Sequence, residues 1–367
     1  MSQEIRLRRL LLTDFRNHAT STFEARAAHV VFTGPNGAGK TNILEAISLL
    51  SPGRGLRRAT YAQMGRQGGA SGFAINARLE RAGQSVSVGI GLAAGASARQ
   101  VRIDGADARP DDLGELLRVL WLTPAMDGLF TGGASDRRRF LDRMALALHP
   151  DHGRRANAYE RAMRQRNRMF EDHVRDPAWF EAVEREMAEH GSTLVRHRAA
   201  LVAALNAEQG ARAAGGQDFP QSILTLGGED GLPDTAPYVA RLAAGRERDR
   251  AAGRALEGPH RADVEVAHVE KAMPAALAST GEQKALLIGL VLGHAALVRR
   301  RTGAAPILLL DEVAAHLDPA RRAALYETLG ALGGQSFMTG TDDTLFEALD
   351  RADRFRVEAG QIVASSA

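Results

Sequence analysis

The chain has 367 residues, 44% of them hydrophobic, and a formal net charge of +3, which suits a globular protein of one large domain or two to three ordinary ones. It contains no cysteine, which excludes disulfides, thiolate catalysis and cysteine-based zinc sites and fits a cytoplasmic location. No N-terminal signal is evident and no apolar run approaches the ~18 residues of a membrane span, so we expect no membrane association. Because the net charge is modest, any surface for nucleic acid must be local.

The first motif lies near the N-terminus. Residues 29–33 (HVVFT) read as a short buried strand, followed by the loop GPNGAGKT at 34–41 and an apolar-periodic helix at 42–50. This order of elements is the context that a P-loop requires. Glycines let backbone amides converge on phosphates, Lys40 is expected to reach the β- and γ-phosphates of ATP, and the Thr41 hydroxyl is expected to bind Mg²⁺. The residues expected at the nucleotide are Gly34, Pro35, Asn36, Gly37, Ala38, Gly39, Lys40, Thr41 and Asn42.

Arginine is concentrated in the middle of the chain. The segment 136–168 holds ten arginines and four acidic residues. Apolar residues recur at helical spacing between 140 and 148, so Arg137, Arg138 and Arg143 are expected on another face, where they could contact DNA phosphates without reading bases. The alternative is a solvated helix surface with intrahelical ion pairs. Because only 5% of the residues are aromatic, stacking on single-stranded bases is disfavoured and duplex DNA is the expected partner.

Two further helices are predicted at 157–174 and from 177 to about 207, with Asp176-Pro177 as a helix-start signal. At ~1.5 Å per residue, the longer helix would span about 45 Å. The pair therefore predicts a short helical arm.

Two motifs lie in the last third of the chain. Residues 278–287 (ASTGEQKALL) combine a turn of small residues with a helix expected to begin at Glu282, and 306–310 (PILLL) read as a strand buried on both faces. That strand ends in Asp311-Glu312, at the edge where parallel sheets bind ligands. Asp311 fits a Mg²⁺ ligand, and Glu312 fits a base that polarises the attacking water. Each motif alone also has a structural explanation, as an acidic strand end or an N-cap turn.

A P-loop, a distant S-x-G-x-Q segment, LLLDE and a following LD resemble the head of ABC-type ATPases. The resemblance implies that the signature segment, residues 278–287, meets the γ-phosphate bound by a second subunit, so that the site is complete only in an ATP-dependent homodimer. Asp318 fits both a helix N-cap before Pro319 and a contact across the subunit boundary. The signature residues expected at the nucleotide are Ser279, Gly281 and Gln283, and the expected catalytic residues are Glu312, Lys40 and Ser279.

Longer segments resemble the RecF family of bacterial recombination and gap-repair ATPases. They are LLTDFRNHAT at 11–20, GPNGAGKTNILEAISLLSPGRGLR at 34–57, TPAMDGLFTGGASDRRRFLDRMALALHP at 123–150, GPHRADVEV at 258–266, STGEQKALLIGL at 279–290, LLLDEVAAHLD at 308–318 and FMTGTD at 337–342. Arg16 and Asn17 match the part of the family motif that reaches the nucleotide, although two solvated turn residues are the alternative.

The resemblance implies ATP-dependent DNA binding in recombinational repair and replication-gap processing, at duplexes and single-strand/double-strand junctions. It implies RecR and RecO as partners that help to load RecA, and weak, DNA-stimulated ATP hydrolysis by a cytoplasmic, nucleoid-associated protein. Thr339 stands where transporter heads have a switch histidine, which makes it a candidate sensor of the γ-phosphate. No counterpart of the glutamine loop is evident.

The expected fold class is α/β: an ABC-type ATPase head with mixed β-sheets in lobe I and a mostly α-helical lobe II with a short helical arm. Lobe I is expected to comprise residues 1–115 and 295–367, and lobe II residues 116–294. The alternative is a structural, SMC-like chromosome-associated head, but such proteins place hundreds of heptad residues in the insert. A transporter-like ATPase is disfavoured by the missing switch histidine.

Overall fold

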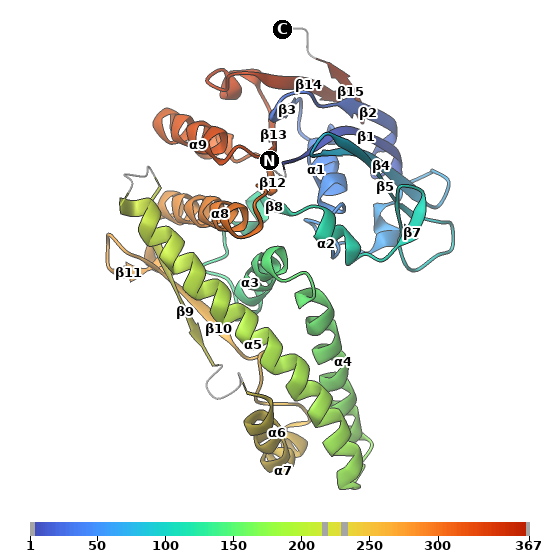
Figure 1. Cartoon of the computed structure of the whole chain (residues 1–367), viewed down its shortest axis with the longest axis vertical. Helices are drawn as coiled ribbons and strands as arrows, with labels where there is room; N and C mark the ends of the chain where they lie inside the picture. Colours follow the sequence, from blue (N-terminus) through green and yellow to red (C-terminus); the bar gives the residue numbers. More distant parts are fainter. Residues whose placement is uncertain (1–3, 215–218, 229–233, 365–367) are drawn as a thin grey trace. The chain divides into compact units, whose positions relative to one another are not determined.

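The computed structural model describes residues 4–214, 219–228 and 234–364. The chain forms two compact units (Figure 1). The first comprises Met1–Asp127, Gly216–Phe219 and Leu287–Ala367, and the second comprises Gly128–Gly215 and Pro220–Leu286.

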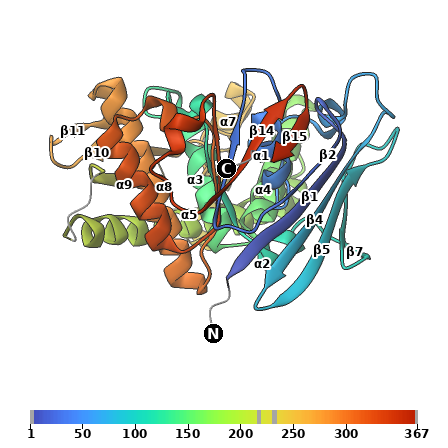
Figure 2. The same ribbon diagram turned by 90° about the horizontal axis from the view of Figure 1, so that it is seen from above.

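The first unit contains a six-stranded antiparallel sheet in the order β2-β1-β4-β5-β6-β7. Its strands are β1 (Ile5–Phe15), β2 (His18–Glu24), β4 (Phe73–Arg81), β5 (Gln84–Leu92), β6 (Gln100–Ile103) and β7 (Ala106–Ala108). Buried and more exposed residues alternate along β4, as expected for a sheet with one face against a core. Figure 2 shows β1, β4 and β5 side by side in this curved sheet.

The second sheet of this unit has the order β15-β14-β3-β13-β12-β8 and is parallel except for β15. Its strands are β3 (His29–Thr33), β8 (Val119–Leu122), β12 (Ile307–Leu310), β13 (Ser336–Gly340), β14 (Ala352–Glu358) and β15 (Gln361–Ala364). Every residue of β12 is buried, as its unbroken apolar run predicted. Strand β8 pairs with β12, so it belongs to this unit, although the sequence pattern had placed residues 116–127 in lobe II.

Helix α1 (Lys40–Ser48) packs between the two sheets and begins at the P-loop lysine. One hydrophobic core unites the helix with both sheets; it includes Ile43, Leu44 and Ile47 of α1, Leu10, Leu12 and Ile75 of the first sheet, and Phe32, Ile307 and Phe337 of the second. The helix that follows the P-loop is therefore packed into the hydrophobic core of the first unit.

Three more helices belong wholly or partly to the first unit: α2 (Asp112–Leu116), α8 (Thr280–Thr302) and α9 (Pro319–Leu332). Helix α8 begins in residues of the second unit and continues into the first. By length and composition α8 could cross a membrane, contrary to the expectation that no segment could. However, 78% of its apolar window is buried inside the protein, as in the core helix of a globular domain, so the helix is weak support for a membrane span.

The second unit is mostly helical. Its elements are α3 (Ala134–Leu148), α4 (His152–Glu171), α5 (Pro177–Ala214), α6 (Thr235–Ala244), α7 (Arg246–Ala252), β9 (Ser222–Gly227), β10 (Asp263–His268) and β11 (Met273–Pro274). Helices α4 and α5 lie side by side as the predicted arm (Figure 1). With 38 residues, α5 is longer than predicted and extends about 57 Å at ~1.5 Å per residue.

The arm also differs from the bare helical pair that was predicted. Side chains of α4, α5 and α6 share a hydrophobic core that includes Tyr159, Phe170, Phe180 and Tyr238. The three strands of this unit form an antiparallel sheet in the order β11-β10-β9. Strand β10 begins inside the segment GPHRADVEV of residues 258–266.

Candidate nucleotide-binding site

The P-loop adopts a backbone that only glycine tolerates at three places. Gly34, Gly37 and Gly39 have φ values of 142°, 81° and 116°, which side-chain-bearing residues rarely adopt. A Cβ on Gly34 would lie 2.2 Å from the Val357 carbonyl oxygen. The glycines expected from the motif are therefore required by the fold of the loop itself.

Asn17 holds the P-loop from the first sheet. Its Nδ2 donates to the Ala38 carbonyl at 2.9 Å, and its Oδ1 accepts from Asn42 Nδ2 at 2.7 Å. The Gly360 amide also donates to the Ala38 carbonyl, at 2.9 Å. Asn17 and Asn42, which were each expected at the nucleotide, are thus bonded to one another beside the P-loop.

His18 is a functional-site residue that the sequence motifs did not single out. It is fully buried, with Nε2 3.2 Å from the Gly39 carbonyl and Nδ1 2.7 Å from the Gly360 carbonyl. Burial lowers the pKa of His18, although its backbone partners Gly39 and Gly360 oppose the change. The available signal was its position inside LLTDFRNHAT, directly after Asn17.

The Arg16 side chain contacts helix α1 and the Gln63 carbonyl. Its Nη2 and Nε bind the buried Glu45 carboxylate of α1 at 2.5 and 2.8 Å, and its Nη1 donates to the Gln63 carbonyl at 2.7 Å. Arg57 binds the same carboxylate at 2.9 Å. The guanidinium of Arg16 is thus engaged with α1, whereas the family motif had indicated a place at the nucleotide.

Lys40 is 4% exposed and folds back over its own loop. Its Nζ donates to the carbonyl oxygens of Gly34 at 2.7 Å and Pro35 at 3.0 Å. Burial lowers the pKa of Lys40, and the charges of Glu312 and Asp311 oppose that change. The ammonium group is therefore held above the P-loop, facing two carboxylates from the end of β12.

The oxygen atoms of Thr41 and Asp311 fit a Mg²⁺ ion. Thr41 Oγ1 donates to Asp311 Oδ1 at 3.0 Å. Mg²⁺ takes octahedral ligands at about 2.0–2.1 Å, so two adjacent ligands lie about 2.9 Å apart. The Thr41 and Asp311 oxygens already have about that spacing, although the two residues are 270 positions apart in the sequence.

Asp311 and Glu312 follow β12 as predicted. Asp311 is 5% exposed, and burial raises the pKa of its carboxyl against the hydrogen bonds from Thr339 and Thr41. Glu312 has a φ of 54°, a left-handed conformation that is uncommon outside glycine. Thr339 of β13 touches both residues: its Oγ1 donates to Asp311 Oδ1 at 2.8 Å and accepts from the Glu312 amide at 3.0 Å.

The signature segment has its own local structure. Ser279 donates to Glu282 Oε2 from its amide at 3.0 Å and from its hydroxyl at 2.9 Å, and Lys271 also binds Glu282. The hydrogen bonds from Lys271 and then Ser279 lower the pKa of Glu282 to about 2. Gln283 Nε2 donates to the Ala278 carbonyl at 2.8 Å. Within the chain, the hydrogen bonds of Ser279 and Gln283 therefore stabilise the turn at the start of α8.

Gly281 differs from the P-loop glycines. A Cβ added at this position would meet no atom within 4 Å, and its φ lies outside the left-handed region. The fold of the chain itself therefore does not require glycine here.

Asp318 accepts a hydrogen bond from the Arg321 amide at 2.8 Å, which confirms the predicted N-cap of α9.

Two of the three arginines predicted at DNA are engaged inside the second unit. Arg137 binds both oxygens of Asp263 at 2.7 and 2.9 Å, and Arg138 Nη1 donates to the Ala262 carbonyl at 2.5 Å. The Arg143 guanidinium lies over the Phe140 ring, 5.3 Å from its centroid. Arg137 and Arg138 thus tie α3 to the start of β10, a contact that the local sequence pattern could not reveal.

Comparisons with known proteins agree with this geometry. A family model described as RecF/RecN/SMC N terminal domain matches residues 6–363. Two relatives, each named DNA replication and repair protein RecF, come from Mesorhizobium japonicum and Rhizobium meliloti; they are 53% and 52% identical over 99% of this chain and 98% and 100% of their own lengths.

Solved structures show the same fold. One described as the recombination mediator protein RecF-ATPrS in the RecFOR pathway has a TM-score of 0.87 at 20% identity and covers 100% of both chains. An Smc head domain from Pyrococcus furiosus has a TM-score of 0.55 at 14% identity, over 99% of this chain and 96% of that one. The predicted α/β ATPase-head fold is thereby confirmed. Matched over nearly its whole length by relatives of that name, the chain belongs to the RecF family of DNA replication and repair proteins.

Proposed function

We propose that the protein is an ATP-dependent DNA-binding protein of recombinational repair and replication-gap processing. The observation that supports this most directly is the assembly of Lys40, Thr41, Asp311 and Glu312 at one edge of the parallel sheet. ATP binding and weak hydrolysis follow from this arrangement, because phosphoryl transfer needs positioned positive charge and little covalent chemistry.

Each residue of this group has one role. The P-loop amides and Lys40 bind the β- and γ-phosphates, and Thr41 with Asp311 would hold Mg²⁺, which neutralises charge on the phosphates when bound. Glu312 orients and deprotonates the attacking water. Asn17 and His18 hold the loop carbonyls, so that the loop amides keep their direction.

We further propose that the site is completed by the signature segment of a second copy of the chain. Gly281 stands in open space, which leaves room for a phosphate at the start of α8. Leu277, two residues before Ser279, is 71% exposed, which suits a surface that another subunit covers. To reach the partner's γ-phosphate, the Ser279 hydroxyl would exchange its bond with Glu282 for one with the phosphate.

Glu312→Gln tests the hydrolytic and dimeric parts together. The amide cannot act as a base, whereas Asp311 still binds Mg²⁺. We expect this variant to bind ATP normally, to lose nearly all turnover and to accumulate as a dimer in ATP, measured by light scattering coupled to size exclusion. A variant that stays monomeric at saturating ATP would contradict the two-subunit site.

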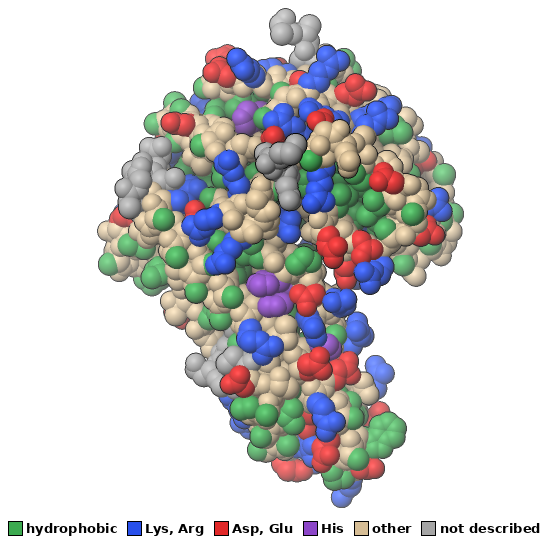
Figure 3. Space-filling model, viewed as in Figure 1, with side chains coloured by type: hydrophobic (Ala, Val, Ile, Leu, Met, Phe, Trp, Pro, Cys, Tyr) green, Lys and Arg blue, Asp and Glu red, His purple; other side chains and the backbone are tan. Residues whose placement is uncertain are grey.

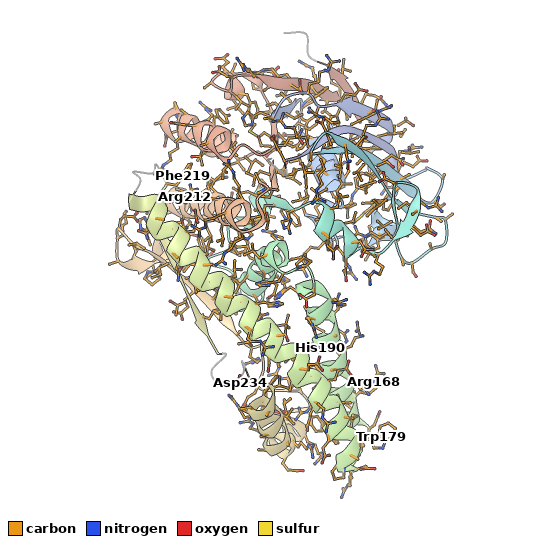
Figure 4. The ribbon with its side chains drawn as sticks, in the orientation of Figure 1. Arg168, Trp179, His190, Arg212, Phe219 and Asp234 are labelled. Atoms are coloured by element: carbon orange, nitrogen blue, oxygen red, sulfur yellow. The ribbon has the colours of Figure 1, made fainter. Side chains whose placement is uncertain are left out.

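We place the DNA contact on α4, because the structure separates engaged arginines from exposed ones in the 136–168 cluster. Arg155 binds Asp151, Arg164 binds Glu160, and Arg166 is fully buried with Glu184 and Asp249. The α4 arginine stripe, defined here as Arg154, Arg161 and Arg168, is exposed, and we find no ion-pair partner for it among the described residues. Figure 4 labels Arg168 near the end of α4, and Figure 3 shows basic side chains interspersed with acidic ones on the arm.

The stripe has the spacing of a surface for phosphates. Its arginines follow at seven-residue intervals, which are ~10.5 Å apart along the helix and turn by only ~20° each. Asn157 and Gln165 lie between them and add donors rather than acids. Such a stripe binds the backbone of duplex DNA and reads no sequence.

Replacing Arg154, Arg161 and Arg168 by Ala tests this site. Duplex affinity should fall equally for all sequences, and the log–log salt dependence should flatten by ~0.9 for each phosphate that the protein no longer neutralises. The matched control replaces the exposed Arg26, Arg78 and Arg301 of the first unit, which removes the same net charge. Equal reductions of duplex affinity in both triple variants would mean that the net charge of the protein, and not the α4 arginine stripe, controls DNA binding.

The finer biological role follows from the family. We propose duplexes and single-strand/double-strand junctions as the DNA targets, RecR and RecO as partners, and assistance to RecA loading at the nucleoid. A gapped duplex with purified RecO, RecR and RecA tests this role. The protein should shorten the lag of RecA filament formation with ATP, and Glu312→Gln, which cannot cycle, should not.

A further inference from the structure

Thr339 lies at the centre of the hydrolytic residues without being one of the predicted catalytic groups. It stands on β13, is 1% exposed, and neighbours β12 in the parallel sheet. Its Oγ1 donates to Asp311 Oδ1 at 2.8 Å and accepts from the Glu312 amide at 3.0 Å. One hydroxyl group therefore contacts both the proposed Mg²⁺ ligand and the backbone of the proposed base.

The direction of these two hydrogen bonds limits what Thr339 can do. A hydroxyl has one proton to donate and two lone pairs to accept with. The proton of Thr339 is already directed at a buried carboxylate. While it is donated to Asp311 it is not available to a phosphate oxygen, which accepts only, so the role of γ-phosphate sensor that the sequence suggested would require this buried bond to break.

The bond to Glu312 acts on a strained residue. With a φ of 54°, Glu312 occupies a conformation that persists in non-glycine residues only where the surroundings hold it. The Glu312 amide has Thr339 Oγ1 as its acceptor. This bond fixes the backbone turn after β12, and the turn determines where the Glu312 carboxylate points.

We propose that Thr339 is a positioning residue for ATP hydrolysis, which orients Asp311 for Mg²⁺ through its proton and orients Glu312 for the attacking water through its lone pair. The inference rests on the proposed ATPase function. It assigns Thr339 an effect on turnover and on Mg²⁺ dependence, but little effect on ATP affinity, because the phosphates are bound by the P-loop and Lys40.

Thr339→Val and Thr339→Ser test the proposal together. Valine keeps the shape and removes the hydroxyl, so turnover should fall about 10- to 100-fold, the usual effect of removing a group that orients a metal ligand. The Mg²⁺ concentration for half-maximal turnover should rise, while the Kd for ATP stays within about twofold of wild type. Serine keeps the hydroxyl and should restore both properties.

Ser336→Ala is the matched control, because it removes another buried hydroxyl of β13, one bonded to His29 Nδ1 at 2.8 Å. It should leave turnover and Mg²⁺ dependence unchanged. If Thr339→Val does not fold, Thr339→Ala is compared with Thr339→Ser in the same way. Wild-type turnover in the folded variant without the hydroxyl, or an equal reduction with serine, would overturn the proposal.

A second pair of measurements separates this proposal from the proposed function. In the Glu312→Gln background, removing the Thr339 hydroxyl should lower the residual turnover by a smaller factor than in the wild type, because only its effect on Asp311 and Mg²⁺ remains. If Thr339→Val instead loses ATP affinity in parallel with turnover, Thr339 contacts the nucleotide and the proposal fails. If the wild-type protein itself does not hydrolyse ATP, the proposed ATPase function fails, whatever Thr339 does.

Discussion

Position 40 in the P-loop requires the ammonium group of lysine, and another positively charged side chain does not replace it. Arginine is the usual basic residue of this chain, which has lysine only at positions 40, 271 and 284. The Lys40 ammonium lies 2.7 and 3.0 Å from two loop carbonyls and is 4% exposed. A planar guanidinium is wider, so it does not fit this space although it carries the same charge.

Lys40→Arg should therefore weaken ATP binding. Removing charge-assisted hydrogen bonds, each contributing ~1.5–3 kcal/mol, corresponds to a decrease in affinity of about 10- to 100-fold. Isothermal titration with a non-hydrolysable nucleotide measures it. The control is Lys271→Arg, at an exposed lysine outside the P-loop, which should bind ATP as wild type; an unchanged affinity in Lys40→Arg would remove the P-loop lysine from the proposed mechanism.

At the scale of elements, three helices of the second unit meet at a group of histidines. The rings of His149 and His197 stack with centroids 4.0 Å apart and planes at 4°. His152 of α4 lies 3.2 Å from His197 Nδ1 and 3.0 Å from Asp142 of α3. Burial first, and then the neighbouring His149 and His152, lower the pKa of His197 to about 4, against the opposing charge of Asp151.

This group predicts a loss of stability in mild acid. Between pH about 6.5 and 4, His197 is protonated in the unfolded chain but neutral in the folded one, so the unfolded state binds more protons and stability decreases as the pH is lowered. Urea midpoints should decrease from pH 7 to pH 5. His197→Asn should reduce that decrease, whereas the exposed His173→Asn should not. An identical pH dependence in both variants would show that other groups control it.

At the scale of the whole molecule, the proposed site divides its parts between two copies of the chain. The P-loop and Asp311 belong to one copy, and Ser279 and Gly281 to the other. A defect in the signature segment should therefore leave ATP binding by its own chain intact. Ser279→Arg should bind ATP with near-wild-type affinity, but it should neither dimerise nor hydrolyse ATP, because the long side chain occupies the space for the partner's phosphate.

Mixing Ser279→Arg with Lys40→Met tests the arrangement across subunits. In the heterodimer, one site combines the intact P-loop of the first variant with the intact signature of the second, while the other site carries both defects. We expect the mixture to recover dimer, and up to half of the wild-type turnover, that neither variant shows alone. Loss of ATP binding by the Ser279→Arg monomer would instead place the signature at the nucleotide of its own chain.

The P-loop, β12 and the N-cap of α9 were predictable from sequence because each depends on neighbours within a few residues. Gly34 and Gly39 satisfy a local backbone requirement, the run at 307–310 is buried on both faces, and Asp318 caps the helix that starts one residue later. Near-neighbour physics determines such elements, so residue type and spacing report them directly.

Only the tertiary structure decided which of the predicted side chains contact other parts of the fold and which remain free to bind a ligand. Arg137 had the same local pattern as the exposed arginines, but Asp263, 126 residues away, binds it. The sequence made Thr339 a candidate sensor of the γ-phosphate, but β13 places its hydroxyl against Asp311, 28 residues earlier in the chain. Hydrogen bonds and ion pairs depend on distance in space, and folding brings together residues whose separation in sequence carries no sign of their contact.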